Sequence, residues 1–315
     1  MCQRGQGERF TLKNSIDKKK QNIFGAIFMS LAMFGYVSND TIIKYFASDL
    51  PIAQVIFIRG LFVIILITFF CWIKGAFNQS IDRQDWPFVL LRSLADVCAT
   101  SLFLTALFNM PLANASAILQ TLPLTVTLLG SVILGERFGA YRAFAIFFGF
   151  VGVLMIIKPG SSGFNNFSLF AIAAVLFITL REIITRQITS RSSTLLISLI
   201  TAISIAFIGG ISGLFTQNWE VVPFTTIVGL SAASVFIFIA YYFSIPAMQF
   251  GEISFVSPFR FTLMIWAVAF GFFFFDEIPD KFTVLGLLIV IAAGIFTYFR
   301  ESYSTQIKRQ ETFYD

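Results

Sequence analysis

Long apolar runs, separated by short polar stretches, fill the sequence from about residue 22 onward. About 20 apolar residues are enough for a helix to cross the hydrocarbon core of a bilayer, since each residue adds about 1.5 Å of length. The intervening stretches carry Pro, Asp, Asn or Lys, as turns between helices do. The pattern therefore predicts an all-α integral membrane protein. Ten transmembrane helices are expected at 23–45, 52–73, 87–108, 112–134, 141–158, 168–188, 194–216, 224–246, 253–275 and 281–299.

Composition supports this prediction and excludes several classes of function. Hydrophobic residues make up 57% of the 315 residues and charged residues only 12%, whereas about a quarter of a soluble domain is charged. The net charge of +5 comes from basic residues in loops and termini, so nucleic-acid binding is not indicated. There is no histidine and only three cysteines. We therefore expect no His-dependent catalysis, no metal site, no disulfide framework and no cofactor.

The distribution of Lys and Arg predicts the orientation in the membrane. The polar stretch 1–21 holds six of these residues, and sixteen fall on the same side of the predicted helices as the N-terminus. The opposite side receives only Lys158 and Lys281. By the positive-inside rule, both termini are expected in the cytoplasm, in a multi-pass protein of the cell (inner) membrane.

Two segments 141 residues apart indicate an internal repeat. Leu134-Gly135-Glu136-Arg137 is similar to Phe275-Asp276-Glu277-Ile278, and a glycine-bearing helix follows each. Five helices per copy is an odd number, so the second copy would be inverted relative to the first. The predicted division is an N-tail at 1–21, repeats at 22–160 and 161–300, and a C-tail at 301–315. Chance similarity among Leu-, Phe- and Gly-rich segments is the open alternative.

Short motifs along most of the chain resemble those of the EamA-type drug/metabolite transporter superfamily. The matching pieces are Ile58-Arg59-Gly60, Leu91-Arg92-Ser93, Met110-Pro111-Leu112-Ala113, Gln120 to Pro123, Gly135-Glu136, Gly149-Phe150-Val151-Gly152, Lys158-Pro159-Gly160, Ser257-Pro258-Phe259-Arg260-Phe261 and Asp276-Glu277-Ile278-Pro279-Asp280. The pattern is most similar to the branch with importers of S-adenosylmethionine, riboflavin and acylcarnitine-like metabolites. The resemblance implies two five-helix halves. Asp276 departs from it, because a Gly is expected before Glu277.

The ninth predicted helix carries the first candidate for a substrate site. Ionisable side chains in hydrocarbon cost several kcal/mol, roughly, so they are candidates for function by default. Arg260 can pair with a carboxylate or phosphate, and the neighbouring Phe259 and Phe261 offer stacking faces. Pro258 interrupts this helix and Pro123 the fourth, and matching interruptions indicate a site near the bilayer midplane. A structural Arg260 paired with Glu252 or a helix-end carbonyl is the alternative.

Further polar residues inside the predicted helices are candidates for binding, coupling or gating. Arg59 is expected either at the substrate or in an interhelical salt bridge, and Asn39 and Gln120 either at the substrate or in interhelical hydrogen bonds. Two pairs are spaced i,i+4, where each can neutralise itself or take part in coupling. Glu136 and Glu277 are expected to cap loops or to pair across the repeat, and Arg181 to anchor a cytoplasmic helix end. The residues considered for coupling or gating are Asp40, Lys44, Arg92, Asp96 and Glu252.

These features favour a secondary or facilitative carrier that works by alternating access and imports a metabolite such as S-adenosylmethionine or riboflavin. An exporter of amino acids or drug-like metabolites is the alternative direction. There is no phosphate-binding loop for ATP. An intramembrane lipid-modifying enzyme would need a cluster of catalytic groups, and a channel would need rings of pore-lining charge; neither pattern is found. The expected partners are a small-molecule substrate and the lipid bilayer, and monomer and homodimer both stay open.

Overall fold

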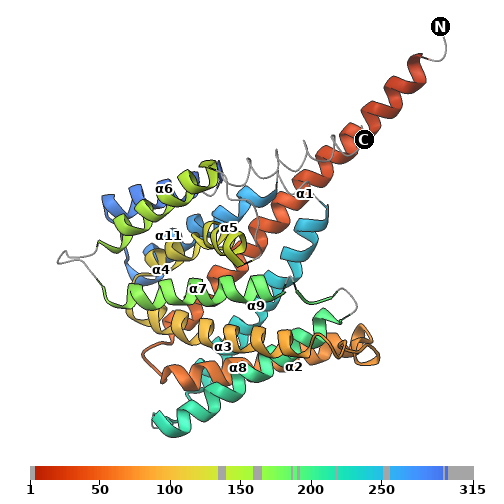
Figure 1. Ribbon diagram of the computed structural model, residues 1–315. Coiled ribbons are helices and arrows are strands. Elements are labelled where there is room, and N and C mark those ends of the chain that lie inside the picture. Colours follow the sequence, from red (N-terminus) through yellow and green to blue (C-terminus); the bar gives the residue numbers. More distant parts are fainter. Residues whose placement is uncertain are drawn as a thin grey trace.

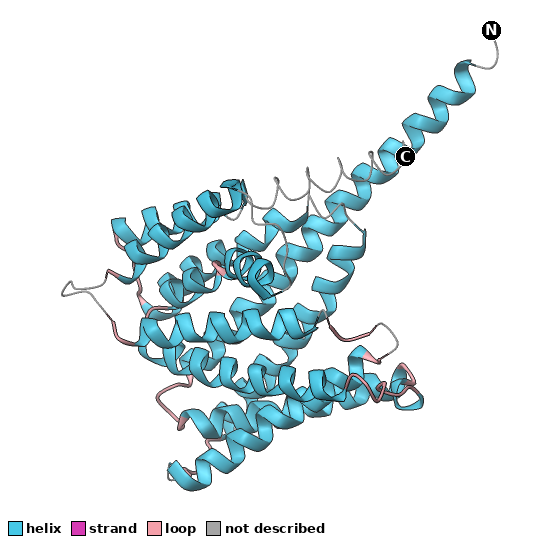
Figure 2. Ribbon diagram, in the orientation of Figure 1, coloured by secondary structure: helices cyan, strands magenta, loops and turns pink. Residues whose placement is uncertain are grey.

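The computed structural model describes residues 4–133, 140–158, 165–185, 187–189, 192–216, 219–250, 256–293 and 295–296, with the backbone alone for 4–20. Throughout this part of the chain the regular elements are helices (Figure 2). The α-helices in chain order are α1 (Arg4–Tyr45), α2 (Ile52–Ile73), α3 (Trp86–Asn109), α4 (Leu112–Leu119), α5 (Leu122–Ile133), α6 (Ala140–Ile157), α7 (Phe167–Thr185), α8 (Thr194–Thr216), α9 (Phe224–Phe250) and α11 (Thr262–Phe275). Two 3-10 helices, η1 (Ala76–Asn78) and η2 (Ser257–Phe261), and a last apolar helix, Lys281–Ala293, complete the described part.

Seven of the helical segments are long and apolar enough to cross a membrane. Three shorter apolar helices, Phe147–Ile157, Phe259–Phe275 and Lys281–Ala293, lie where the remaining predicted helices were expected. The multi-pass, all-α prediction is therefore confirmed in the described part of the chain. The first helix is longer than expected: α1 begins at Arg4 and so includes most of the predicted N-tail, and it projects beyond the bundle (Figure 1).

The fourth predicted helix, at 112–134, is interrupted near Pro123 and consists of two helices. α4 ends at Leu119, and α5 begins at Leu122. Pro123 has no backbone N–H to donate, so it fits the first turn of a new helix better than the interior of a continuous one. Between the two helices, the Thr121 N–H donates to the Ile118 carbonyl at 3.1 Å. Likewise η2 and α11 form the ninth, with Pro258 in η2.

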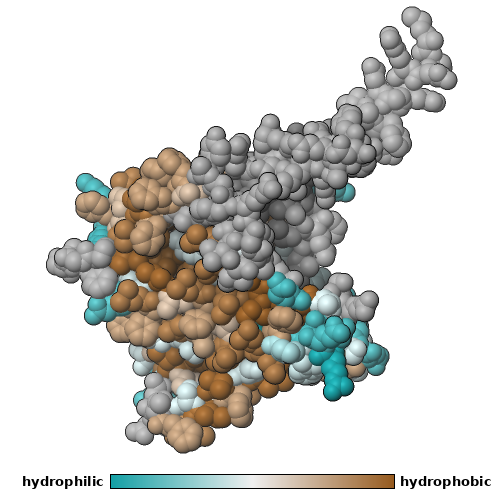
Figure 3. Space-filling model, viewed as in Figure 1, coloured by the Kyte–Doolittle hydropathy of each residue, from teal (hydrophilic) through white to brown (hydrophobic). Residues whose placement is uncertain are grey.

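Apolar side chains cover the outside of the bundle as well as its interior. Phe215, Phe273 and Trp72 are 84, 75 and 72% exposed, and brown apolar surface covers much of the face in Figure 3. Leu107 and Leu230, by contrast, are fully buried in the core. Helices that are apolar on both faces are typical of proteins whose solvent is lipid.

Helices from before and after residue 160 interleave. α1 packs on α9, α3 on α7 and α2 on α8, while α1 and α4 both contact α11. Close approaches at glycines join α6 to the last helix and α2 to α8. A Cβ on Gly152 would lie 2.7 Å from the Gly286 carbonyl oxygen, and a Cβ on Gly60 would lie 2.7 Å from the Ala206 Cβ. The glycines therefore let backbones meet, as small residues do in membrane bundles.

Candidate functional site

The two interrupted helices meet each other. Gln120, in the break between α4 and α5, donates from Nε2 to the Arg260 carbonyl of η2 at 3.3 Å. Gln120 is buried, while the Arg260 side chain is exposed and Phe259 and Phe261 are half-buried. The hydrogen bond joins irregular backbone from the fourth and ninth helices. Irregular backbone at membrane depth is tolerated where it lies inside protein or lines a polar space.

Arg59 lies inside the bundle and is linked to α1. Its Nη1 is 3.5 Å from Asn39 Oδ1, at the long limit for a hydrogen bond, and Asn39 Nδ2 donates to Asp40 Oδ1 at 2.9 Å. The Arg59 carbonyl also accepts from the Ser234 hydroxyl of α9 at 3.2 Å. The structure therefore brings together Arg59, Asn39 and Asp40 of the predicted site residues.

Lys44 does not pair with Asp40, although the i,i+4 spacing allowed it. Its Nζ donates to Glu277 Oε1 at 2.5 Å and to the Met110 carbonyl at 2.6 Å. Glu277 Oε2 in turn accepts the Leu112 N–H at the start of α4 at 2.7 Å. The Lys44 side chain therefore reaches both Glu277, in the loop after α11, and the Met110 carbonyl, which follows α3. Glu277, expected either to cap a loop or to pair across the repeat, thus forms an ion pair with a residue of α1.

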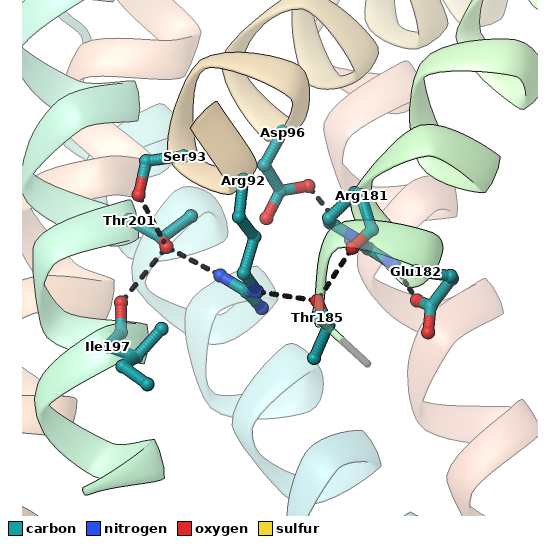
Figure 4. Close-up of polar contacts among 8 residues, drawn as sticks. All are labelled: Arg92, Ser93, Asp96, Arg181, Glu182, Thr185, Ile197 and Thr201. Carbon is teal, nitrogen blue, oxygen red and sulfur yellow. Dashed lines mark hydrogen bonds and ion pairs between the residues drawn. The ribbon is translucent and has the colours of Figure 1, made fainter. Parts of the chain in front are cut away.

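The second i,i+4 pair, Arg92 and Asp96, also finds other partners (Figure 4). Arg92 donates from Nε to Thr185 Oγ1 at 3.0 Å and from Nη1 to Thr201 Oγ1 at 2.6 Å. Asp96 Oδ1 accepts from Arg181 Nη1 at 2.8 Å. Arg92 and Asp96 thus form no direct ion pair with each other in the described part of the chain, and α7 brings a second guanidinium to the Asp96 carboxylate.

Arg181 is a residue whose importance the sequence did not indicate. It was expected to anchor a helix end, yet it bridges two carboxylates. Its Nη1 donates to Asp96 Oδ1 at 2.8 Å and its Nη2 donates to Glu182 Oε1 at 2.7 Å. Its position four residues before the end of α7 was the available signal, because it places the guanidinium within the helix.

Two tyrosines were also missed. Tyr36 of α1 and Tyr241 of α9 form an edge-to-face pair with ring centroids 5.7 Å apart. Charges of Arg59, Arg92, Asp96 and Arg181 act on Tyr241, and those of Arg181 and Arg260 act on Tyr36. Aromatic side chains are so common in this sequence that their positions alone did not single out this pair.

Outside the membrane-spanning segments, Asp85 ties two loops together. Its Oδ2 accepts from the Ser192 hydroxyl at 2.6 Å and from the Thr189 hydroxyl at 2.7 Å. These hydrogen bonds hold the pKa of the Asp85 carboxyl below its usual value. The contact joins the start of α3 to the loop before α8.

Some predicted residues are not placed by this geometry. Glu252 and Glu136 lie outside the described residues, so their expected roles stay predictions. Within the described ranges, no group of three or more Cys, Asp or Glu side chains is arranged to hold a metal ion. The site is therefore a set of arginines, carboxylates, amides and aromatic rings contributed by several helices.

Comparison with known proteins adds a family to this geometry. Residues 23–158 match the EamA-like transporter family. Neither the family nor the relatives below are enzymes, which confirms the expectation of a transporter.

Named relatives match this chain over most of its length. It is 25% identical to an S-adenosylmethionine uptake transporter of Rickettsia prowazekii, covering 93% of this chain and 99% of that one. It is 24% identical to the pseudopaline exporter CntI of Pseudomonas aeruginosa (86 and 94% covered). It is 25% identical to a riboflavin transporter of Vibrio cholerae (88 and 94% covered). A protein crystal structure superposes with a TM-score of 0.57 at 14% identity, covering 89% of this chain and 96% of that one, which shows the shared fold.

Proposed function

We propose that this chain is a carrier that moves a small organic metabolite across the cytoplasmic membrane by alternating access. The observation that carries the proposal is the contact between the breaks of the fourth and ninth helices, through Gln120 and the Arg260 carbonyl. Interrupted helices in matching places are how inverted-repeat carriers build a binding site. The relatives with transporter names over most of this chain support the same function.

The packing pattern supports two inverted repeats at 22–160 and 161–300. Counting the helices from one to ten, α1 with α9 is the pair one–eight, and α3 with α7 is the pair three–six. Moving each member by five helices converts either pair into the other. The pairs α2–α9 and α3–α8 exchange in the same way, and α2–α8 and α4–α11 convert into themselves. A pseudo-two-fold arrangement has this property, and rocking of one repeat against the other would expose the site to each side in turn.

The substrate is proposed to bind among the polar groups at the centre of this arrangement. Arg260 and Arg59 favour an anionic or zwitterionic substrate, and half-buried Phe259 and Phe261 favour an apolar or aromatic part. The proposed binding residues are Arg260, Arg59, Phe259, Phe261, Gln120 and Asn39, and those proposed for coupling or gating are Asp40, Lys44, Arg92, Asp96 and Glu252. We infer import of a metabolite such as S-adenosylmethionine or riboflavin, with both termini in the cytoplasm. Export is the second candidate, because a relative of similar identity is named an exporter.

Uptake into proteoliposomes tests this function. The substrates are labelled S-adenosylmethionine, riboflavin, carnitine esters and amino acids. They are offered to the wild type, to Arg260→Ala and to the control Lys281→Ala, an exposed residue at the start of the last helix. We expect saturable uptake of one compound, lowered at least about 10-fold by Arg260→Ala, the size of a lost charged hydrogen bond. Lys281→Ala should transport normally. Unchanged uptake in Arg260→Ala would remove Arg260 from the site, and no saturable uptake or counterflow of any compound would contradict the carrier.

A further inference from the structure

Several N–H groups of the Arg92 guanidinium have no hydrogen-bond acceptor in the described part of the chain. Of its five N–H groups, one on Nε points to Thr185 and one on Nη1 to Thr201 (Figure 4). Both acceptors are neutral hydroxyls, and no carboxylate among the described residues is bonded to Arg92. The hydroxyl hydrogens are committed to helix carbonyls, since Thr185 donates to the Arg181 carbonyl at 2.6 Å and Thr201 to the Ile197 carbonyl at 2.9 Å. The lone pairs of both threonines therefore hold Arg92 in one orientation, with Nη2 unused within the described part of the chain.

Asp96 leaves an acceptor unused next to these donors. Its Oδ1 binds Arg181, but among the described residues nothing donates to its Oδ2. Arg92 and Asp96 are four residues apart on α3 and thus on one face of the helix. An unused donor edge and an unused carboxylate oxygen therefore lie about one helical turn apart. A charged side chain with unused hydrogen-bonding groups is costly in a membrane-spanning helix, and in membrane proteins such residues mark substrate or ion pathways.

An aromatic surface lies beside this pair. Tyr241 is 50% exposed although the charges of Arg92, Asp96 and Arg181 from α3 and α7 act on it. Tyr241 therefore lies within electrostatic range of the charged side chains of α3 and α7. Tyr36 of α1 packs edge-on against Tyr241.

We propose that Arg92 and Asp96 bind the α-amino-acid end of the transported substrate. Arg92 takes the carboxylate through its unused N–H groups, Asp96 Oδ2 takes the ammonium group, and Tyr241 lies against the adjoining part of the molecule. The two opposite charges of such an end match the two unused groups on one helix face. This inference rests on the proposed carrier function and narrows it, because riboflavin carries neither a carboxylate nor an ammonium group.

Binding to the purified full chain in lipid nanodiscs tests the substrate class. The probes are S-adenosylmethionine and L-phenylalanine, each beside its decarboxylated and its deaminated analogue, and riboflavin. At least one amino acid should bind, and removal of either group should weaken its binding about 10- to 100-fold, as expected for charged hydrogen bonds. Riboflavin should not compete. The proposal is overturned if neither amino acid binds, or if a parent and its two analogues bind equally.

Two substitutions test the assignment of each group to its residue. Arg92→Gln should weaken binding of the parent amino acid but not of its decarboxylated analogue, and Asp96→Asn should weaken the parent but not the deaminated analogue. Such selective losses isolate a pairwise contact, whereas a merely structural role would weaken all probes alike. Glu182→Gln, on the far side of Arg181, is the matched control with unchanged binding. If Arg92→Gln does not fold, Thr185→Val frees the guanidinium while keeping its charge and should weaken the parent more than its decarboxylated analogue.

Uptake of the same probes into proteoliposomes separates this inference from the carrier function. Transport of riboflavin with no binding of either amino acid would overturn the amino-acid site and keep the carrier. Selective binding of an amino acid without uptake or counterflow would support the site and contradict the carrier. Equal loss of every probe in Arg92→Gln and Asp96→Asn, with both variants folded, would assign the two residues to packing and overturn the site.

Discussion

Charged side chains form contacts near both ends of α3, but the two contacts differ in how many of their hydrogen-bonding groups are used. After the C-terminal end, the Met110 carbonyl belongs to the Lys44–Glu277 contact, made of Lys44, Glu277 and the backbone of Met110 and Leu112. Near the N-terminal end lies the Arg92 network, the residues drawn in Figure 4. Eighteen residues, about 27 Å of helix, separate Arg92 from Met110. Both contacts join helices from before and after residue 160.

The difference lies in how many hydrogen-bonding groups are used. In the Lys44–Glu277 contact, both carboxylate oxygens have donors and the ammonium has two acceptors and a ring, Phe275, at 5.0 Å. In the Arg92 network, one guanidinium is held by neutral hydroxyls and one carboxylate oxygen has no donor among the described residues. A charge whose partners are complete ties helices together. A charge held in place with groups unused is suited to binding something else.

Removing Glu277 should have the largest effect on stability. Glu277→Ala leaves the Lys44 ammonium without its ion-pair partner and the α4 N–H of Leu112 without an acceptor. The side chains of Lys44 and Glu277 are only 11 and 18% exposed, and breaking such a pair costs about 3–5 kcal/mol. Thermal unfolding of the purified protein in detergent measures the loss.

The double variant Lys44→Met/Glu277→Leu is the control. Because it removes both charges and keeps apolar volume, it should recover most of the stability lost in Glu277→Ala. A double variant less stable than either single one would show that the contact matters through packing, and the comparison of the two ends would fail.

Arg181→Gln should cost less, about 1–3 kcal/mol. It removes the donor to Asp96, but Arg92 lies one helical turn away on α3 and can pair with the freed carboxylate. That new pairing also occupies the groups left unused in the native network. The uptake rate should therefore fall by more than the modest loss in the free energy of unfolding would explain. Unfolding and uptake are measured on the same preparation, with Glu182→Gln as the control. A stability loss as large as that of Glu277→Ala would show that Arg92 does not replace Arg181 as the partner of Asp96.

The helices followed from the sequence because hydropathy over some 20 residues reports directly on the solvent of a membrane helix. The interruptions were located by Pro123 and Pro258, whose missing N–H groups act locally. By contrast, the extent of α4 depended on the turn at Gln120 and Thr121, which side-chain patterns do not reveal. The helix breaks were therefore predicted from the prolines, but the residue at which α4 ends was not.

The partners of the charged residues were predicted less well, because they depend on which helices pack together. The i,i+4 spacing placed Asp40 with Lys44 and Arg92 with Asp96, yet Glu277 and Arg181 from distant parts of the sequence took over. Both competitors come from the other half of the chain, where a single sequence carries no distance information. Glu277 was the exception, because its expected pairing with the other half came from the repeat.

Asp276→Gly should stabilise the Lys44–Glu277 end by up to about 1 kcal/mol. Asp276 follows α11 with φ of 53°, the left-handed region that glycine adopts without cost, and it lies where the resemblance led us to expect Gly. The turn places the Glu277 N–H on the Gly271 carbonyl at 3.0 Å. Unfolding measurements should show the gain, and Asp276→Ala, which lacks glycine's freedom, should not. Equal stability of both variants would show that the turn carries no strain.

The smallest effect should come from an exposed ion pair at the same end, between Lys158 and Asp280. The hydrogen bond from Lys158 holds the pKa of the Asp280 carboxyl at about 2, against about 4 in an unfolded chain. A lowered pKa in the folded state stabilises fully above about pH 4, and this contribution is lost as the pH falls through about 2. Because the Asp280 side chain is 48% exposed, we expect less than about 1 kcal/mol.

Unfolding temperatures of the wild type, Asp280→Asn and Lys158→Met between pH 5 and pH 2 measure this contribution. Asp280→Asn keeps an acceptor for the N–H groups of Phe282 and Thr283, which Asp280 Oδ1 accepts at 2.9 and 3.1 Å, so it removes the charge and not the helix cap. Both variants should lose part of the acid-dependent destabilisation. If only Asp280→Asn shows less acid-dependent destabilisation, the N-terminus of the helix and not Lys158 lowers the pKa of Asp280. The exposed Lys158–Asp280 pair would then stabilise by a different mechanism from the buried Lys44–Glu277 pair.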